Sequence, residues 1–298
     1  GKEGTHLDAV DGVLSKNPIE HGQADSVLGV EADYAAGETR IVQYWLAAGQ
    51  SIDEVRRLNQ YVRERGGAHL VETATNFWRA WVHRRNFSFY GLDQPVIDLF
   101  NRSLLVIRAH ADKNGAIVAS GDSNSLQQGK DTYSYVWPRD ASIAALALDR
   151  AGDHEVARRF FSFCLSVLGD HDYFLHKYSP DKSLGSSWHP WVDKRGAAQL
   201  PIQEDETALV LWALWQHYEL SKDLEFIEEL YNPLIKKTAD FMVLYREPKT
   251  GLPQPSYNLW EESFGSHTFT AAAVCGALRA AADFARLLGK RKNEALYR

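Results

Sequence analysis

The chain has 298 residues, of which 45% are apolar and 24% are charged. This composition supports a large buried core and excludes a disordered or fibrous protein. The formal net charge of −6 gives no basic surface, so nucleic acid is not expected as the main partner. No apolar run is long enough to cross a bilayer, because the best candidate, residues 271–288, is interrupted by charged side chains.

The ends of the chain predict a piece of a longer or processed product. The chain begins with Gly1, its only methionine is Met242, and residues 290–298 form a charged, helix-like stretch without a stop signal. The missing signal peptide therefore decides little about the compartment, which stays open with a slight preference for the cytoplasm. The oligomeric state also stays open.

The first fifty residues have a strand-like composition. Residues 26–31 and 39–47 are rich in Val, Ile, Leu, Tyr and Trp and are separated by Ala and Gly. This pattern is typical of a hairpin or of neighbouring strands.

Two helices are expected next. Ser51 is a good N-cap, Glu54 completes a capping box, and a Gly-Gly pair at 66–67 ends the first helix. The second helix, over residues 70–84, is expected to bury three aromatic rings. These rings are Phe77, Trp78 and Trp81.

From about residue 93 the apolar spacing is helical. Without convincing strand alternation between the helices, this pattern fits a helix bundle, a solenoid or an (α/α) toroid. The helix at 204–220 is apolar nearly all round, which predicts burial on both sides. The expected helices are 95–111, 140–151, 155–168, 204–220, 223–245 and 268–288.

The first of three notable loops places Trp137 before Pro138, Arg139 and Asp140 at the start of a helix. A guanidinium beside a carboxylate suits neighbouring sugar hydroxyls. The simpler alternative is that Asp140 only complements the helix dipole.

The second loop carries Trp188 and Trp191 among Ser and Pro residues and runs on to three acids at 204–206. Tryptophan rings in such a loop are hard to place in a core and stack well on apolar sugar faces. The acids are more simply explained as structural residues of a first helical turn.

The third loop has Trp260 followed by Glu261 and Glu262. Repulsion between adjacent carboxyl groups and partial burial under Trp260 would raise the pKa of one of them, as a general acid requires. A solvated acidic loop explains the same residues equally well. The sequence has no metal-ligand spacing of histidines, no phosphate loop and no nucleophile elbow, so no metal or cofactor is expected.

Together these loops resemble the glucoamylase-type glycoside hydrolases of family 15, especially their bacterial and archaeal branch. The matching strings are YVWPRDA, SLGSSWHPW, LPIQEDETALVLWAL and PSYNLWEE. Residues 25–51 also resemble the last strands of that branch's β-sandwich, so the resemblance covers nearly the whole chain. It implies a mainly α fold. Residues 1–50 would be the C-terminal part of a β-sandwich domain, 51–92 a helical linker, and 93–298 the truncated N-terminal part, about half, of an (α/α)6 catalytic barrel.

The resemblance also implies roles for single residues. The family's general acid falls on Glu261, and Glu262 would help to bind the sugar on the leaving-group side. The family's clamp on the terminal, non-reducing sugar matches Trp137, Arg139 and Asp140. Further candidates for binding substrate are Trp260, Trp188 and Trp191.

The implied function is an inverting, exo-acting hydrolase that releases glucose from the non-reducing ends of α-glucans or α-glucosides. An acid protonates the leaving oxygen while a carboxylate base activates water on the opposite face. The family's base comes from much later in the barrel and matches no residue here, so the chain on its own is expected to be inactive. Fungal relatives also have a Trp where this chain has Ala-Ala-Gln at 197–199. No membrane partner is implied, and calcium binding is left open.

Three alternatives remain at this point. A trehalase or a glucodextranase would keep the acid and the sugar clamp and differ in the leaving-group loops. A non-catalytic carbohydrate-binding fragment would use the Trp loops without a base. A helical scaffold for protein partners would leave the Trp-rich loops and the adjacent acids unexplained.

Overall fold

The computed structural model describes residues 5–16, 19, 26–121, 133–187, 189–192 and 195–298. They divide into two compact units, residues 1–76 and 77–298, and each unit is described by itself. Of the residues expected to bind substrate, Trp188 lies outside the described part of the chain. All the other candidate site residues lie in the second unit.

The first unit contains a short helix, α1 (Thr5–Asp8), then α2 (Ile52–Arg65) and the beginning of α3 (Gly67–Val82). The predicted N-cap is confirmed, since Ser51 Oγ accepts a hydrogen bond of 3.2 Å from the Glu54 N–H. The Glu54 carboxylate reaches back to the Gln50 N–H at 2.8 Å, one residue earlier than in an ideal capping box. Gly66 ends α2 with a positive φ of 79°, a conformation that glycine adopts at no steric cost.

The two strands expected at 26–31 and 39–47 are not formed in the described residues, which are extended but unpaired there. Their apolar side chains are exposed, as at Ile41 and Leu46. A strand needs a neighbour that takes up its backbone N–H and C=O groups, and the described residues offer none to these segments. The β-sandwich assignment of residues 1–50 therefore stays a prediction.

The second unit is helical, as expected. Its first helices are α4 (Gln94–Ala109), α5 (Pro138–Arg150), α6 (His154–Leu168) and α7 (Glu204–Ser221). They are followed by α8 (Leu224–Leu230), the π-helical η2 (Tyr231–Lys236), α9 (Lys237–Leu244), α10 (Thr268–Leu287) and α11 (Arg291–Tyr297). One small antiparallel hairpin pairs β1 (Ser256–Tyr257) with β2 (Phe264–Gly265). None of the described helices is long and apolar enough to span a membrane.

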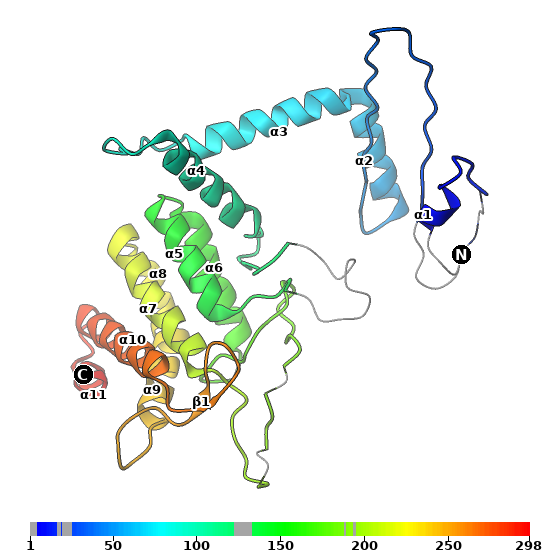
Figure 1. Ribbon diagram of the computed structural model, residues 1–298. Helices are drawn as coiled ribbons and strands as arrows, with labels where there is room; N and C mark the ends of the chain where they lie inside the picture. The colour runs from blue at the N-terminus through cyan, green and yellow to red at the C-terminus, as the bar shows by residue number, and fades with distance from the viewer. Residues whose placement is uncertain (1–4, 17–18, 20–25, 122–132, 188, 193–194) are drawn as a thin grey trace. The chain divides into compact units, whose positions relative to one another are not determined.

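The helices α5, α7 and α10 form one layer, in which α7 packs against both of the others (Figure 1). The helices α6, α9 and α11 pack behind this layer. As predicted, α7 is buried along most of its length, and Leu211 and Leu214 join the core. The starts of α5, α7 and α10 meet, because Arg139, Asp205 and Thr270 are joined by an ion pair and a hydrogen bond. Three helix N-termini, with their positive dipole ends, thus surround one place.

Two details depart from the predicted helices. The single helix expected over 223–245 is divided by η2, which contains Pro233. Proline has no N–H for the α-helical ladder, and a π-turn accommodates that gap. The expected burial of Phe77 is wrong, because its ring is 60% exposed, whereas Trp81 packs against the core.

Candidate active site

The candidate site begins where α5 starts. Trp137 precedes the helix in an extended conformation, and Pro138 lies in its first turn, where a missing N–H breaks no helical bond. Val136 pairs with Tyr178 through two backbone hydrogen bonds of 2.8 and 2.9 Å. This pairing brings His176 next to Trp137, whose indole Nε1 donates to His176 Nε2 at 3.2 Å.

Arg139 is the centre of a buried charge cluster. Its Nη1 lies 2.9 Å from Asp205 Oδ2 and 3.0 Å from Glu206 Oε1, and it donates to Gln203 Oε1 at 2.5 Å. Its Nη2 lies 3.2 Å from Asp140 Oδ2. Burial alone would lower the pKa of the guanidinium, but the neighbouring acids, Glu206 first, outweigh it and raise the pKa. Arg139 is therefore a permanent positive charge at the start of α5.

The three acids that open α7 are completely buried. Burial raises the pKa of Glu206 well above its usual range, against the pull of Arg139. Burial, and then repulsion from Asp205, raises the pKa of Glu204 to about 8. Both Glu204 carboxyl oxygens are buried without a hydrogen-bond partner among the described residues. These surroundings favour the neutral form of the Glu204 carboxyl near pH 7.

The loop between β1 and β2 presents Glu261. The Asn258 carbonyl accepts the Glu261 N–H at 2.8 Å, and Asn258 Oδ1 accepts the Glu262 N–H at 2.9 Å. Glu261 has a φ of 61°, in the left-handed region that non-glycine residues seldom occupy and that recurs at functional sites. Its side chain is 16% exposed, and Oε1 contacts His176 Nε2.

The environment of Glu261 favours its protonated form. Burial raises the pKa of this carboxyl above its usual range, while Lys177, Arg139 and the Gln203 side chain act in the opposite direction and offset only part of it. Lys177 is itself buried, with its ammonium 5.1 Å from the centre of the Trp137 ring. A partly exposed carboxyl with a raised pKa is what a general acid requires.

Trp260 does not provide the burial that the sequence suggested for Glu261. Its ring is 73% exposed, and the fully buried His176 contacts the carboxyl instead. Glu262, next to the acid, is exposed. The two carboxyl groups therefore lie in different surroundings, and burial rather than repulsion between them accounts for the raised pKa of Glu261.

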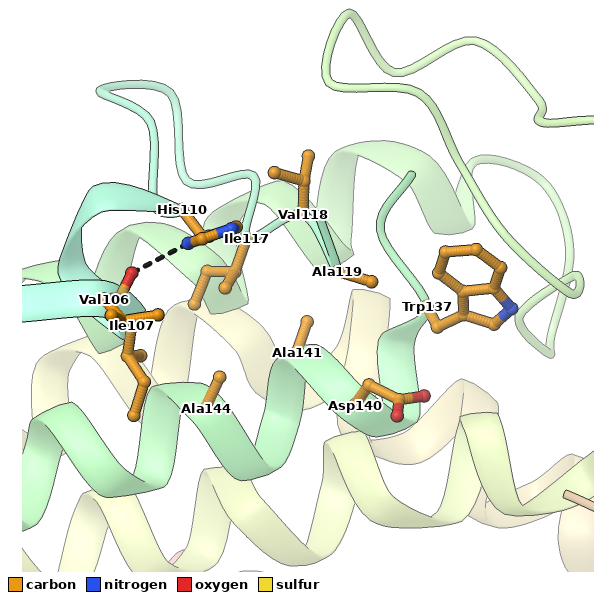
Figure 2. A pocket seen from close by; sticks show the side chains of 10 residues that line it. All are labelled: Val106, Ile107, His110, Ile117, Val118, Ala119, Trp137, Asp140, Ala141 and Ala144. Carbon is orange, nitrogen blue, oxygen red and sulfur yellow. Dashed lines mark hydrogen bonds between the residues drawn. The ribbon is translucent and has the colours of Figure 1, made fainter. Parts of the chain in front are cut away.

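Two cavities meet at the start of α5. One, of about 560 Å³, contains Arg139 and Asp140 together with Trp212, Leu259 and Phe269. The other, of about 300 Å³, has Trp137 and Asp140 at one end and otherwise mainly apolar side chains from α4, α5 and the segment after α4 (Figure 2). The Asp140 carboxylate is 59% exposed and lines both cavities, so it is available to a ligand.

Trp191 lies at a third cavity of about 540 Å³, which Tyr245 and Phe264 also line. Its ring is 56% exposed. Phe264 contacts Tyr257, with ring centres 5.3 Å apart, and Tyr257 stacks on His189 at 4.5 Å. Trp191 thus lines a different cavity from Arg139.

The family model for glycosyl hydrolases family 15 matches residues 98–298. The chain belongs to this family. It is 29% identical over 227 residues to an uncharacterized glycosyl hydrolase of Methanocaldococcus jannaschii, covering 75% of this chain and 33% of the relative. It is 28% identical over 213 residues to Trehalase 2 of Sulfolobus acidocaldarius, covering 65% and 36% respectively. The chain thus spans about a third of the length of the curated relatives it matches.

Solved structures show the same fold. A bacterial glucoamylase complexed with acarbose matches with a TM-score of 0.64 and 24% identity, over 84% of this chain and 33% of that one. A glycosidase in complex with glucose matches with a TM-score of 0.53 and 24% identity, over 69% of this chain and 56% of that one. A glucoamylase from Saccharomycopsis fibuligera matches with a TM-score of 0.51 and 18% identity, over 71% of this chain and 49% of that one. The helices of this family 15 chain therefore follow part of the glucoamylase (α/α)6 barrel.

Four candidate residues from the sequence, Trp137, Arg139, Asp140 and Glu261, lie close together in the structure. Two further residues that the sequence analysis did not select, His176 and Gln203, contact members of this group. Gln203 directly precedes the acids of α7, and its oxygen orients the Arg139 guanidinium. The sequence signal at Gln203 was its place in the quoted Pro-Ile-Gln string. His176 lies in a short irregular segment, where neither spacing nor neighbours mark it.

Histidine and acid side chains gather at two places in the described residues. Asp149 accepts Nδ1 hydrogen bonds from His154 at 2.5 Å and from His217 at 2.8 Å, distances that suit hydrogen bonds rather than two ligands of one ion. Near Glu261, the rings of His176 and His189 contact each other at a tilt of 35°, with centres 4.3 Å apart. We assign no metal to either place.

Proposed function

We propose that this chain carries the acid-catalytic half of an inverting, exo-acting α-glucoside hydrolase of the glucoamylase type. The observation that supports this most is the Glu261 carboxyl, partly buried and with a raised pKa, beside the cluster around Trp137 and Arg139. Family membership supports a glycoside as substrate. The complex of a structural neighbour with glucose is consistent with that class.

In this proposal Glu261 protonates the leaving oxygen of the glycosidic bond. Burial favours the protonated form of this carboxyl, while its side chain, 16% exposed, is still accessible to a bound ligand. Such proton transfer contributes about 10²–10⁴-fold to the rate. The left-handed backbone of Glu261, held by Asn258, fixes where the carboxyl points.

The terminal glucose is bound at the start of α5. Asp140 offers an exposed carboxylate that accepts sugar hydroxyls, and Arg139, oriented by Gln203, lies beside it. Trp137 lines the same cavity as Asp140 and is proposed to contact the sugar there. Glu262 is exposed beside Glu261 and is proposed to contact the sugar on the leaving-group side, with Trp260 and Trp191 as outer stacking surfaces.

The general base is not assigned to any residue of this chain. An inverting mechanism needs a second carboxylate roughly 6.5–9.5 Å from the acid, with room for the attacking water. The three acids of α7 do not suit this role, since they are completely buried. Glu204 and Glu206 also have raised pKa values that favour their neutral forms.

The test is Glu261→Gln in the full-length protein, with maltose as substrate. We expect turnover to fall by about 10²–10⁴-fold, because the amide has no acidic proton to give. Binding of a glucose-like iminosugar, measured by isothermal titration, should largely survive. Glu219→Gln, at an exposed position of α7, is the matched control and should leave turnover unchanged. Unchanged turnover in Glu261→Gln would reject the assignment.

A second candidate is trehalase activity, which the similarity to Trehalase 2 of Sulfolobus acidocaldarius favours. The acid and the sugar clamp would serve both reactions, because the terminal glucose is the same. Rates of glucose release from maltose, isomaltose and trehalose decide between glucoamylase, glucodextranase-like and trehalase specificity. If iminosugar binds while none of the three sugars is cleaved, the site is a carbohydrate-binding site without catalysis.

A further inference from the structure

One buried imidazole nitrogen touches both the proposed acid and a tryptophan. His176 is completely buried, and its Nε2 accepts the Trp137 indole N–H at 3.2 Å. The Oε1 atom of Glu261 contacts the same Nε2. An indole nitrogen can only donate, so a hydrogen bond from it requires a lone pair on Nε2. The network therefore assigns the neutral tautomer of His176, with its hydrogen on Nδ1.

This tautomer decides which partner holds the proton between His176 and Glu261. A lone pair on Nε2 attracts an O–H group and repels a carboxylate oxygen. The contact with Oε1 is thus favourable when Glu261 is protonated and donates to Nε2, where its O–H shares the single lone pair with the Trp137 N–H. The opposite arrangement, an Nε2–H that donates to a carboxylate, would turn that hydrogen against the indole N–H of Trp137.

The surrounding charges do not reverse this preference. Lys177 and Arg139 both favour the ionised form of Glu261, and burial outweighs them. Arg139 contacts Asp205 and Glu206 directly, so its positive charge acts less strongly on Glu261. The remaining polar groups of the neighbourhood are Gln203, the exposed Asp140 and Glu262, and His189, whose ring lies tilted against that of His176. Burial, and then Lys177, lowers the pKa of His189 to about 4, so it adds no charge near neutral pH.

We infer that His176 is a positioning residue that keeps the general acid protonated in the free enzyme, with Trp137 fixing the imidazole as a proton acceptor. This inference rests on the proposed role of Glu261. It gives Trp137 a second task besides contact with the sugar, because its N–H sets the tautomer of His176.

The proton itself stays on Glu261 until substrate binds. A half turn of the carboxyl group carries the O–H from His176 Nε2 to the glycosidic oxygen. The bond between C1 and that oxygen breaks, its electron pair stays on the oxygen, and the proton from Glu261 completes a hydroxyl group. Water adds its oxygen to C1 and loses a proton to the base. The Glu261 carboxylate then takes a proton from solvent and donates to His176 again.

The kinetic test is the pH profile of kcat/KM in the full-length enzyme with His176→Phe. A phenyl ring keeps the space filled but presents a partly positive C–H edge, which no longer favours the protonated acid. We expect the alkaline limb of the profile to move to lower pH by about one unit, while the acidic limb, set by the base, stays in place. The control is His189→Phe, which changes a buried ring one step further from the acid. An equal shift in the control, or an unmoved alkaline limb in His176→Phe, would overturn the inference.

The structural test starts from the wild-type protein. Nitrogen NMR of histidine-labelled wild-type protein reports whether Nε2 of His176 carries a hydrogen. We expect Nε2 without a hydrogen and Nδ1 with one, and Trp137→Phe should weaken this preference. A hydrogen on Nε2 in the wild type contradicts the inference. Glu261→Gln separates the two proposals, because full activity in that variant rejects the role of Glu261, whatever the tautomer of His176.

Discussion

The two ends of α5 carry two buried polar clusters that differ in how completely they are satisfied. At the C-terminal end, Asp149 is 1% exposed and both its oxygens accept hydrogen bonds, from His154 and His217. These bonds join α5, α6 and α7. At the N-terminal end, Arg139 also joins helices, but here a carboxyl with a raised pKa, Glu261, lies beside the cluster on a loop with left-handed backbone.

The difference separates structural from functional charge. A cluster in which every charged group has its partner stabilises the packing and has little left to offer a ligand. At the Arg139 end, Asp140 is 59% exposed into two cavities. Strain at Glu261 and an accessible carboxylate at Asp140, rather than the number of charges, distinguish the end of the helix where we propose catalysis.

The largest effect on stability is expected from Arg139→Met. This change removes the buried guanidinium that contacts Asp205 and Glu206 and leaves their buried oxygens without that donor, which costs about 3–5 kcal/mol of unfolding free energy. Urea denaturation measures it. The matched control is Arg286→Met, which removes an exposed ion pair to Asp283 and should cost less than about 1 kcal/mol. Equal losses in the two variants would show that the Arg139 cluster is no more than another surface pair.

The next effect is a dependence of stability on pH that Glu204 creates. Its pKa of about 8 in the folded protein lies above the value of about 4.3 for an exposed Glu. Stabilisation from this group is therefore complete below pH 4 and is lost as the pH rises toward 8. Relative to Glu204→Gln, the wild type should lose roughly 3 kcal/mol of unfolding free energy between pH 5 and pH 8. Parallel stability curves for the two proteins would contradict the burial argument.

A smaller effect is expected at the other end of α5, from Asp149→Asn. The amide keeps one acceptor and turns an NH₂ group toward an imidazole donor, so stability should fall by about 1–3 kcal/mol. Below the melting temperature, activity of the full-length protein and its pH profile should stay as in the wild type. A changed pH profile of kcat/KM would mean that the two clusters are coupled and that the contrast between them is wrong.

The helical part of the fold was readable from the sequence because its signals are local. Apolar spacing, the Ser51 cap and the nearly all-round apolar face of 204–220 predicted α2, α4 to α7 and α10 closely. The sequence shows Pro233 inside the expected helix, but it does not show that the helix continues there as a π-turn, since that depends on how the neighbouring helices pack. The local pattern could not decide whether residues 26–31 and 39–47 form strands, because strand formation depends on a partner segment.

The site was predictable in part. Quoted strings placed Trp137, Arg139 and Glu261, but the same strings could not show that Glu261 is buried by His176 instead of Trp260. That contact joins residues 85 positions apart, and an isolated histidine gives no spacing signal. The acids at 204–206 illustrate the same limit, since the sequence identified them only as structural residues of a first helical turn and could not show that the fold buries all three.

The central claim is that Glu261 supplies the leaving oxygen with its proton, and α-glucosyl fluoride tests it most directly. Fluoride is a good leaving group that needs little help from an acid, whereas the glucose of maltose departs only when its oxygen is protonated. In Glu261→Gln, the full-length protein should lose about 10³-fold in kcat on maltose and less than about 10-fold on the fluoride. Equal losses on the two substrates would contradict the account.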